Sequence, residues 1–115
     1  MANQFEAIIT LVNRGFSDLV MEAARSEGAR GGTVINARGT ADKNLSKKYG
    51  VAITPDKELV LIVVNTTIRD KVLEAIYKAA GLETDGHGIA FAIPVDSVAG
   101  LKYDEPLNSE EKVNG

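Results

Sequence analysis

The sequence predicts an α+β fold, a ferredoxin-like sandwich with the element order β-α-β-β-α-β. Residues 5–38 and residues 58–95 each show two β-branched apolar runs with an amphipathic helical pattern between them. Two such units with right-handed crossovers give a four-stranded antiparallel sheet with two helices on one face. The length of 115 residues suits one ordinary domain. We therefore predict a domain over residues 1–103 and a flexible polar tail over residues 104–115.

The first unit begins with a strand over residues 5–12, where β-branched and apolar side chains predominate. A helix follows over residues 16–25, and Gly28 is placed to end it. Residues 33–38 form the second strand. The apolar residues of the helix recur at helical spacing, at Phe16, Leu19, Val20, Ala23 and Ala24.

The second unit begins with a strand over residues 58–65. Thr67 is the expected N-cap of the next helix, with Asp70 at the third helical position as in a capping box. Gly81 is placed to end this helix, and residues 89–95 form the last strand. The apolar stripe of the helix consists of Ile68, Val72, Ala75, Ile76 and Ala79.

Between the two units, residues 39–56 form a long polar segment. Loops of this length inside a compact domain tend to be either functional or disordered. Gly39 and Gly50 allow backbone freedom, so we predict that the loop contacts a partner protein. The positively charged residues of this segment are Arg38, Lys43, Lys47 and Lys48. They would either attract an anionic ligand or keep a solvent-exposed loop hydrated.

The predicted sheet has apolar side chains on both faces, although the helices cover only one of them. Both the first strand and residues 59–64 carry consecutive apolar residues, which point alternately to the two faces. An uncovered apolar face of this size is unusual for a monomer. We therefore predict that the chain self-associates through this face.

Composition excludes several classes of function. A formal net charge of -3 gives no basic face for nucleic acid, and the absence of cysteine excludes disulfides and thiol catalysis. His87 is the single histidine, so we expect no metal site, no catalytic triad and no enzymatic activity. The longest strongly apolar stretch, residues 59–64, is too short to cross a bilayer. We therefore expect a cytoplasmic protein without membrane insertion or a targeting segment.

Gly86, His87 and Gly88 form a glycine-dense turn between the second helix and the last strand. Glycines allow consecutive N–H groups to converge on one point, which is the arrangement that cradles a phosphate. The same residues would equally serve a tight turn. The sequence leaves both interpretations open.

Four segments follow one another with a characteristic spacing: residues 5–9 (FEAII), 32–39 (GTVINARG), 60–64 (VLIVV) and 86–96 (GHGIAFAIPVD). Together they resemble the PII signal-transduction family (nitrogen regulatory protein P-II), over roughly residues 5–103. This resemblance implies a homotrimer whose three sheets line the centre. It also implies that adenine nucleotides bind in clefts between subunits.

In this family each cleft is walled by the base of the long T-loop, a glycine-rich B-loop and a C-terminal segment near residues 97–103. The resemblance assigns the T-loop to about residues 39–56 and the B-loop to residues 82–88. The residues that it places at the nucleotide are Ile8, Thr33, Arg38, Gly39, Lys43, Val63, Gly86, His87, Gly88 and Lys102.

The sequence departs from the family pattern at several cationic positions. Ile89 stands where a lysine usually follows the second B-loop glycine, and Gly100 stands at a usual arginine position. His87 replaces the usual aspartate, and Lys43 lies near the place of a glutamine that helps to bind Mg²⁺-ATP and 2-oxoglutarate. Each lost hydrogen bond to a charged group is worth about 1.5–3 kcal/mol. These departures predict weakened triphosphate binding.

The resulting hypothesis is an energy sensor that binds ADP, ATP or AMP as an effector, without a tightly bound cofactor. It would regulate a target, a membrane transporter or a metabolic enzyme, through the T-loop. One alternative is a PII-like trimer that has lost nucleotide binding and serves as a constitutive interaction module. A second is a small acylphosphatase-like hydrolase with Arg14 and Gly15 in its phosphate loop.

Overall fold

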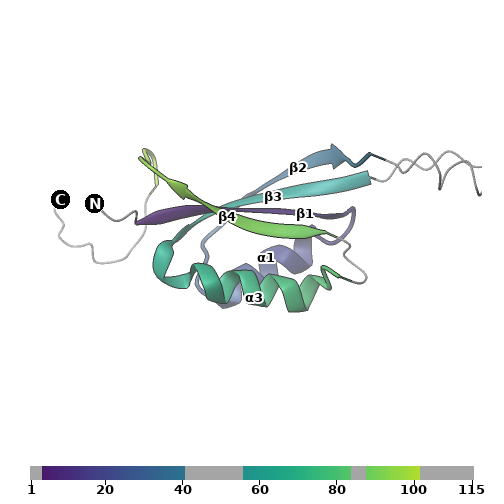
Figure 1. Ribbon diagram of the computed structural model, residues 1–115, viewed down its shortest axis with the longest axis horizontal. Coiled ribbons are helices and arrows are strands. Elements are labelled where there is room, and N and C mark those ends of the chain that lie inside the picture. The colour runs from purple at the N-terminus through teal and green to yellow at the C-terminus, as the bar shows by residue number, and fades with distance from the viewer. Residues whose placement is uncertain (1–3, 41–55, 84–87, 102–115) are drawn as a thin grey trace, which may run out of the picture.

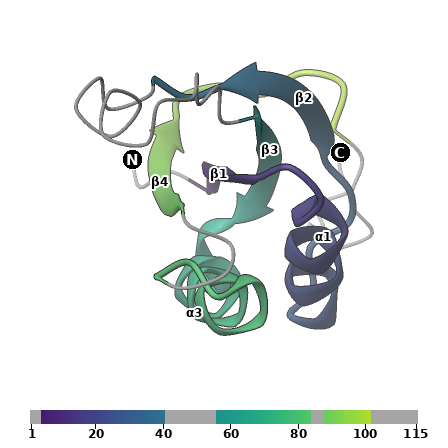
Figure 2. The same cartoon turned by 90° about the vertical axis from the view of Figure 1, so that its right-hand side faces the viewer.

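The protein is described by a computed structural model over residues 4–40, 56–83 and 88–101. It contains one four-stranded sheet with the strand order β2-β3-β1-β4, in which every neighbouring pair is antiparallel (Figure 1). Both α-helices lie on the same face of the sheet (Figure 2). This architecture confirms the predicted ferredoxin-like fold. The elements are β1 (Phe5–Asn13), α1 (Ser17–Ser26), β2 (Thr33–Arg38), β3 (Asp56–Asn65), the 3₁₀ helix η1 (Thr66–Ile68), α3 (Arg69–Ala80) and β4 (Ile89–Val95).

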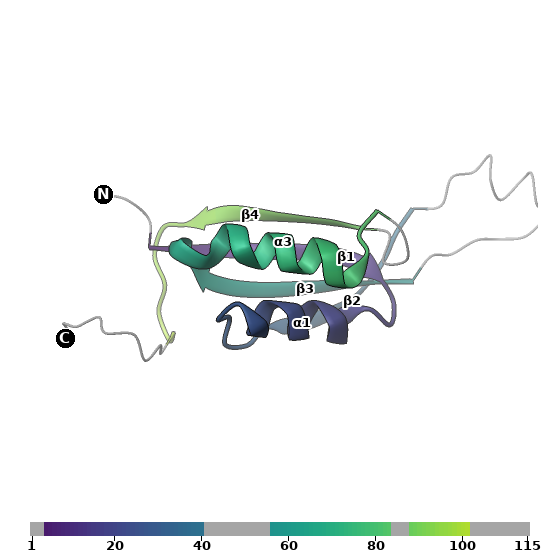
Figure 3. The same cartoon turned by 90° about the horizontal axis from the view of Figure 1, so that it is seen from below.

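The core lies between the sheet and the two helices, which run side by side beneath it (Figure 3). In the central pair of strands, Ile8 of β1 is opposite Ile62 of β3. Because side chains alternate along a strand, every second residue from these two positions also faces the helices. The fully buried large side chains of the core are Ile8, Val12, Val20, Val60, Ile62, Val64, Val72 and Ile76.

The opposite face of the sheet is apolar as well, and no described element covers it as the helices cover the first face. The strand register places Ile9 beside Leu61 and Phe91, and Leu11 beside Leu59 and Ile89. We call this surface the open face. Its most exposed large side chains are Ile35 at 47%, Phe91 at 40%, Ile93 at 44% and Ile89 at 57% exposure. The predicted apolar open face is therefore present in the structure.

The two C-terminal helix ends agree with the sequence predictions. Gly28 adopts a φ of 108° just beyond α1, and Gly81 adopts a φ of 58° as the C-cap of α3. Both values lie in the left-handed region that glycine enters without a Cβ clash. α1 itself begins at Ser17, one residue later than expected.

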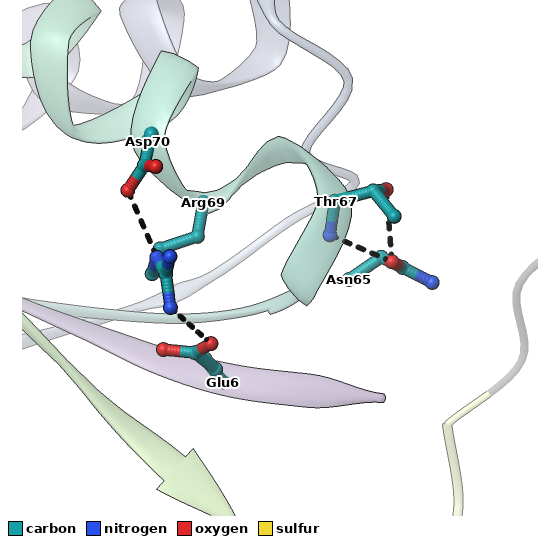
Figure 4. A network of polar contacts seen from close by, with 5 residues as sticks. All are labelled: Glu6, Asn65, Thr67, Arg69 and Asp70. Atoms are coloured by element: carbon teal, nitrogen blue, oxygen red, sulfur yellow. Dashed lines mark hydrogen bonds and ion pairs between the residues drawn. The ribbon is translucent and has the colours of Figure 1, made fainter. Parts of the chain in front are cut away.

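The prediction that Thr67 caps the second helix is wrong. The capping side chain is that of Asn65, whose Oδ1 accepts hydrogen bonds from the Thr67 N–H and from the Thr67 hydroxyl, both at 2.9 Å (Figure 4). A 3₁₀ turn thus precedes α3, which starts at Arg69 without a side-chain cap. Asparagine is a stronger cap than threonine, so the sequence pattern also fits a start two residues earlier.

The last residue of the segment predicted as a loop over residues 39–56, Asp56, belongs to the sheet. β3 begins at Asp56, two residues before the expected start, because Asp56 pairs with Arg38 at the end of β2. Residues 41–55 lie outside the described residues, as does the predicted tail over residues 104–115.

An ion-pair network ties the start of α3 to the first strand. The Arg69 guanidinium donates from Nη1 to Glu6 Oε2 at 2.6 Å and from Nε to Asp70 Oδ1 at 2.9 Å (Figure 4). The Glu6 side chain is only 9% exposed, so this partner keeps a nearly buried carboxylate compensated. The neighbouring carboxylates, that of Asp70 above all, raise the pKa of Arg69. The network therefore fixes α3 on β1 at one end.

One buried polar atom in the described core has no hydrogen-bond partner. It is the hydroxyl of Thr10, which is fully buried on β1 among the apolar side chains that face the helices. A buried hydroxyl without a partner costs about 1–3 kcal/mol of folding stability.

Replacing Thr10 with Val is therefore expected to raise the free energy of unfolding by about 1 kcal/mol, since the shape is kept and the hydroxyl is removed. Urea unfolding at fixed protein concentration measures this change. Thr40→Val, at an exposed described position, is the matched control and should change stability by less than about 0.5 kcal/mol. A destabilised Thr10→Val variant would mean that the hydroxyl does have a partner.

Candidate functional site

A hollow of about 350 Å³ lies where β2 and β3 meet the segment that follows β4. The register places Thr33 opposite Leu61, and Val63 follows on the same open face. Two residues that the resemblance places at the nucleotide, Thr33 and Val63, are thus brought together. The residues that line the hollow are Arg30, Gly31, Gly32, Thr33, Leu61, Val63 and Leu101.

The chemistry of the hollow combines an apolar floor with polar groups at its side. Leu61, Val63 and Leu101 supply aliphatic surface, while Thr33 offers a hydroxyl and Arg30 a guanidinium. Such a lining suits a flat apolar group with hydrogen-bonding edges. The hollow is open to solvent along the sheet edge, since β2 is an outer strand of the sheet.

Gly32 allows β2 to enter the sheet at this point. A Cβ at Gly32 would lie 2.9 Å from the carbonyl oxygen of Leu61 and 2.9 Å from Cγ1 of Ile62. Real Cβ atoms almost never approach so closely, so any other residue would displace the start of β2. Gly32 therefore fixes the position of Thr33, which follows it directly.

Backbone hydrogen bonds hold the turn after α3 on both sides of residues 84–87, which themselves lie outside the described residues. The Leu82 N–H donates to the carbonyl of Tyr77 at 3.3 Å, and the Gly88 N–H donates to the carbonyl of Leu82 at 2.8 Å. The Tyr77 hydroxyl is hydrogen-bonded to Glu83, and this bond together with the carboxylate charge raises the pKa of Tyr77. Leu82 is thus held by α3, and Gly88, at the other end of the predicted B-loop, is held by Leu82.

Gly88 has a packing role that its sequence context did not reveal. A Cβ at this position would lie 1.7 Å from the carbonyl oxygen of Leu11, so the chain can approach β1 this closely only without a side chain. Because its N–H already donates to Leu82, Gly88 does not present that donor toward a ligand in this structure. The geometry favours the tight-turn interpretation for Gly88.

The remaining predicted site residues are not gathered at the hollow. Ile8 is fully buried and faces the helices, so it has no surface that a ligand could contact in this chain. Arg38 is exposed and lies opposite Asp56 at the far end of β2, with Gly39 next to it. Four predicted residues lie outside the described residues: Lys43, Gly86, His87 and Lys102.

The phosphate loop of the acylphosphatase alternative is occupied by a carboxylate. Glu58 Oε1 accepts hydrogen bonds from the Gly15 N–H at 3.1 Å and from the Ser17 N–H at 3.3 Å. The Arg14 guanidinium pairs with Asp56 at 3.4 Å. Since an anionic side chain already accepts from these donors, the arrangement argues against this hydrolase. Within the described ranges, no three His, Cys, Asp or Glu side chains gather as a metal site requires.

Sequence reasoning missed part of the hollow. Arg30, Gly32 and Leu61 were not expected to line a site, whereas Leu101 falls in the C-terminal segment that the resemblance assigned to the cleft. The signal for Gly32 was present in the glycine pair before the second strand. Only the three-dimensional structure shows that Gly32 lies against the backbone of Leu61.

Comparison with known proteins assigns the chain to a family. The family described as "Nitrogen regulatory protein P-II" matches residues 5–105. The chain belongs to this family and is a PII-like signalling protein. No curated protein matches the sequence.

Among 160 matching chains of solved structures is one described as "Crystal Structure of Arabidopsis thaliana PII bound to citrate". It is 24% identical, with a TM-score of 0.63, and the match covers 82% of this chain and 77% of that chain. This structure supports the fold. None of the described helices is long and apolar enough to span a membrane.

Gly88→Ala is expected to lower the free energy of unfolding by about 3 kcal/mol, because the added methyl group meets backbone and not a movable side chain. Gly31→Ala is the control: a Cβ there meets no atom within 4 Å, and the change should stay below about 0.5 kcal/mol. Urea unfolding of the two variants compares them directly. Equal stabilities would contradict the close approach of Gly88 to β1.

Proposed function

We propose that the chain is a homotrimeric, cytoplasmic sensor of cellular energy state that binds adenine nucleotides and regulates a target protein through its T-loop. The observation that carries this proposal is the hollow that contains Thr33 and Val63. It lies on the apolar open face beside an outer strand, which is where a second subunit would complete a cleft.

Self-association supplies the missing half of the site. The open face exposes Ile35, Ile89, Phe91 and Ile93, and apolar area removed from water stabilises association by about 25 cal/mol per Å². A second chain packed on this face would also wall the hollow, which is open in one chain alone. The family membership supports three chains as the assembly.

The chemistry of the hollow fits the base of the nucleotide. An adenine ring would lie on the aliphatic floor of Leu61 and Val63, with the Thr33 hydroxyl within reach of its polar edge. The phosphates would be bound by the cationic residues that the resemblance assigns, namely Arg38, Lys43 and Lys102, and by the B-loop backbone.

Ile89 sets the expected preference among nucleotides. Its side chain lies on the open face beside Leu11 and is 57% exposed, at the position where the family has a phosphate-binding lysine. Without this cation, and with Gly100 at an arginine position, the site loses contacts that the third phosphate needs most. ADP or AMP should therefore bind at least as tightly as ATP.

The T-loop is the proposed output. Its residues leave the sheet at the pair of Arg38 and Asp56, the last pair of the β2–β3 ladder. A ligand at the base of this loop would change the target affinity only through contacts that differ between loop conformations. The target would be a membrane transporter or a metabolic enzyme.

A second candidate is a PII-like trimer that does not bind nucleotide. One observation favours it: the Gly88 N–H is already bonded to Leu82, which removes a donor from the proposed phosphate site. The next residue, Ile89, is apolar. Such a protein would present its T-loop constitutively.

Calorimetric titration with ADP and ATP decides between the two candidates. The sensor is expected to bind ADP at least as tightly as ATP, and Ile89→Lys should raise ATP affinity about tenfold by adding a charge-assisted contact. Ile89→Met, of similar size but uncharged, should leave both affinities near those of the wild type. Light scattering on each sample checks that the assembly is kept. Absence of any heat with either nucleotide would favour the constitutive module.

A further inference from the structure

The N-terminus of α1 is capped by a side chain from a distant strand. Phe16, the residue at the N-cap, makes no side-chain cap bond. Instead, Glu58 of β3 accepts from the Gly15 N–H at 3.1 Å and from the Ser17 N–H at 3.3 Å. The first N–H groups of a helix have no partner within the helix, and a carboxylate there is also favoured by the helix dipole. Glu58 therefore stabilises the first turn of α1.

The residues around Glu58 bind the same turn. The Arg14 N–H donates to the carbonyl of Asp56 at 3.0 Å, and the Arg14 guanidinium lies 3.4 Å from the Asp56 carboxylate. The Lys57 ammonium donates to Asn13 Oδ1 at 2.9 Å. Three consecutive residues of β3 are thus each bonded to the β1–α1 turn. We call this set of contacts the clip, formed by residues 13–17 and 56–58.

The clip lies at the end of the sheet from which the T-loop departs. Asp56 is paired with Arg38 in the last pair of the β2–β3 ladder. Residues 56–58 are therefore the first part of β3 to move if that end of the ladder is displaced. Glu58 is half-buried there, with its backbone opposite Val12 of β1 and Asn36 of β2.

We propose that the clip couples the end of β3 to the first turn of helix α1, so that the position of the T-loop base changes the stability of this turn. Displacement of residues 56–58 withdraws the Glu58 carboxylate from the Gly15 and Ser17 N–H groups and loosens the first turn of α1. This turn carries Asp18 and Leu19, which are exposed on the helix surface. That a nucleotide causes the displacement rests on the proposed function, whereas the coupling itself does not.

Coupling between two segments must act in both directions, and this allows a test without any ligand. Gly15 adopts a φ of 98°, and a Cβ added there would meet no atom within 4 Å, so Gly15→Ala strains the turn without a steric clash. We expect the amide hydrogens of residues 56–59 to exchange about tenfold faster in this variant. Gly100→Ala is the matched control, because Gly100 has a φ of 87° and equally open space. It should leave residues 56–59 unchanged.

The reverse direction uses Glu58→Ala, which should speed exchange of the amides of residues 15–19 about tenfold, in the range of a lost cap. Glu74→Ala removes an exposed carboxylate from α3 and should not affect these amides. Glu58→Gln keeps an oxygen acceptor, so its amide exchange rates in residues 15–19 should fall between those of the wild type and Glu58→Ala. This graded result would distinguish loss of the cap from a general loss of folding.

The proposal is overturned if Gly15→Ala changes exchange only within residues 15–19, or if Glu58→Ala leaves those residues unchanged. Adding ADP to the wild type provides the link to function, and exchange should change in residues 15–19 and 56–59 together. If calorimetry shows that ADP does not bind, the proposed nucleotide function fails, while the two variants still decide whether the segments are coupled.

Discussion

One constraint governs this structure: a single sheet is apolar on both faces, and its two helices cover only one of them. The helix-facing residues, such as Ile8 and Ile62, form the core of the chain. The residues between them, such as Ile9, Leu61 and Phe91, form the open face. A monomer would leave this second surface in water, at a cost that grows with its area. We propose that chains associate through this face, which would place the hollow at the edge of the open face where subunits meet.

Strand β3 connects the core, the hollow and the clip. It lies between β2 and β1, and its alternating side chains serve two environments. Val60, Ile62 and Val64 enter the core, while Leu61 and Val63 form the floor of the hollow. At its first residues, Glu58 caps α1 from a position next to the loop base. Any movement of this strand relative to its neighbours would therefore change both the hollow and the capping of α1 by Glu58.

The sequence was sufficient to predict the elements that depend on residues close together along the chain. Strands, helices, the ending glycines and the apolar open face follow from periodicity and from the placement of Gly28 and Gly81. The predicted start of α3 was wrong because both Asn65 and Thr67 can cap a helix, and the structure uses Asn65, the stronger cap of the two. The packing role of Gly88 and the clip at Glu58 could not be predicted, since each depends on a strand that is distant in the sequence. For the proposed site, the family resemblance predicts Thr33 and Val63, which line the hollow, and Ile8, which is buried in the core of this chain.

The central claim is that the open face joins the subunits and thereby completes the ligand site. The most direct measurement uses Ile93→Lys, which places a charge on the open face at a residue that is 44% exposed. Leu19→Lys makes the same kind of change on α1, at a residue that is 40% exposed. Molar mass and ADP binding are measured on both variants. We predict that Ile93→Lys loses assembly and ADP binding together, whereas Leu19→Lys keeps both. A single-chain Ile93→Lys protein that binds ADP as tightly as the wild type would contradict this claim, as would an Ile93→Lys protein that still assembles fully.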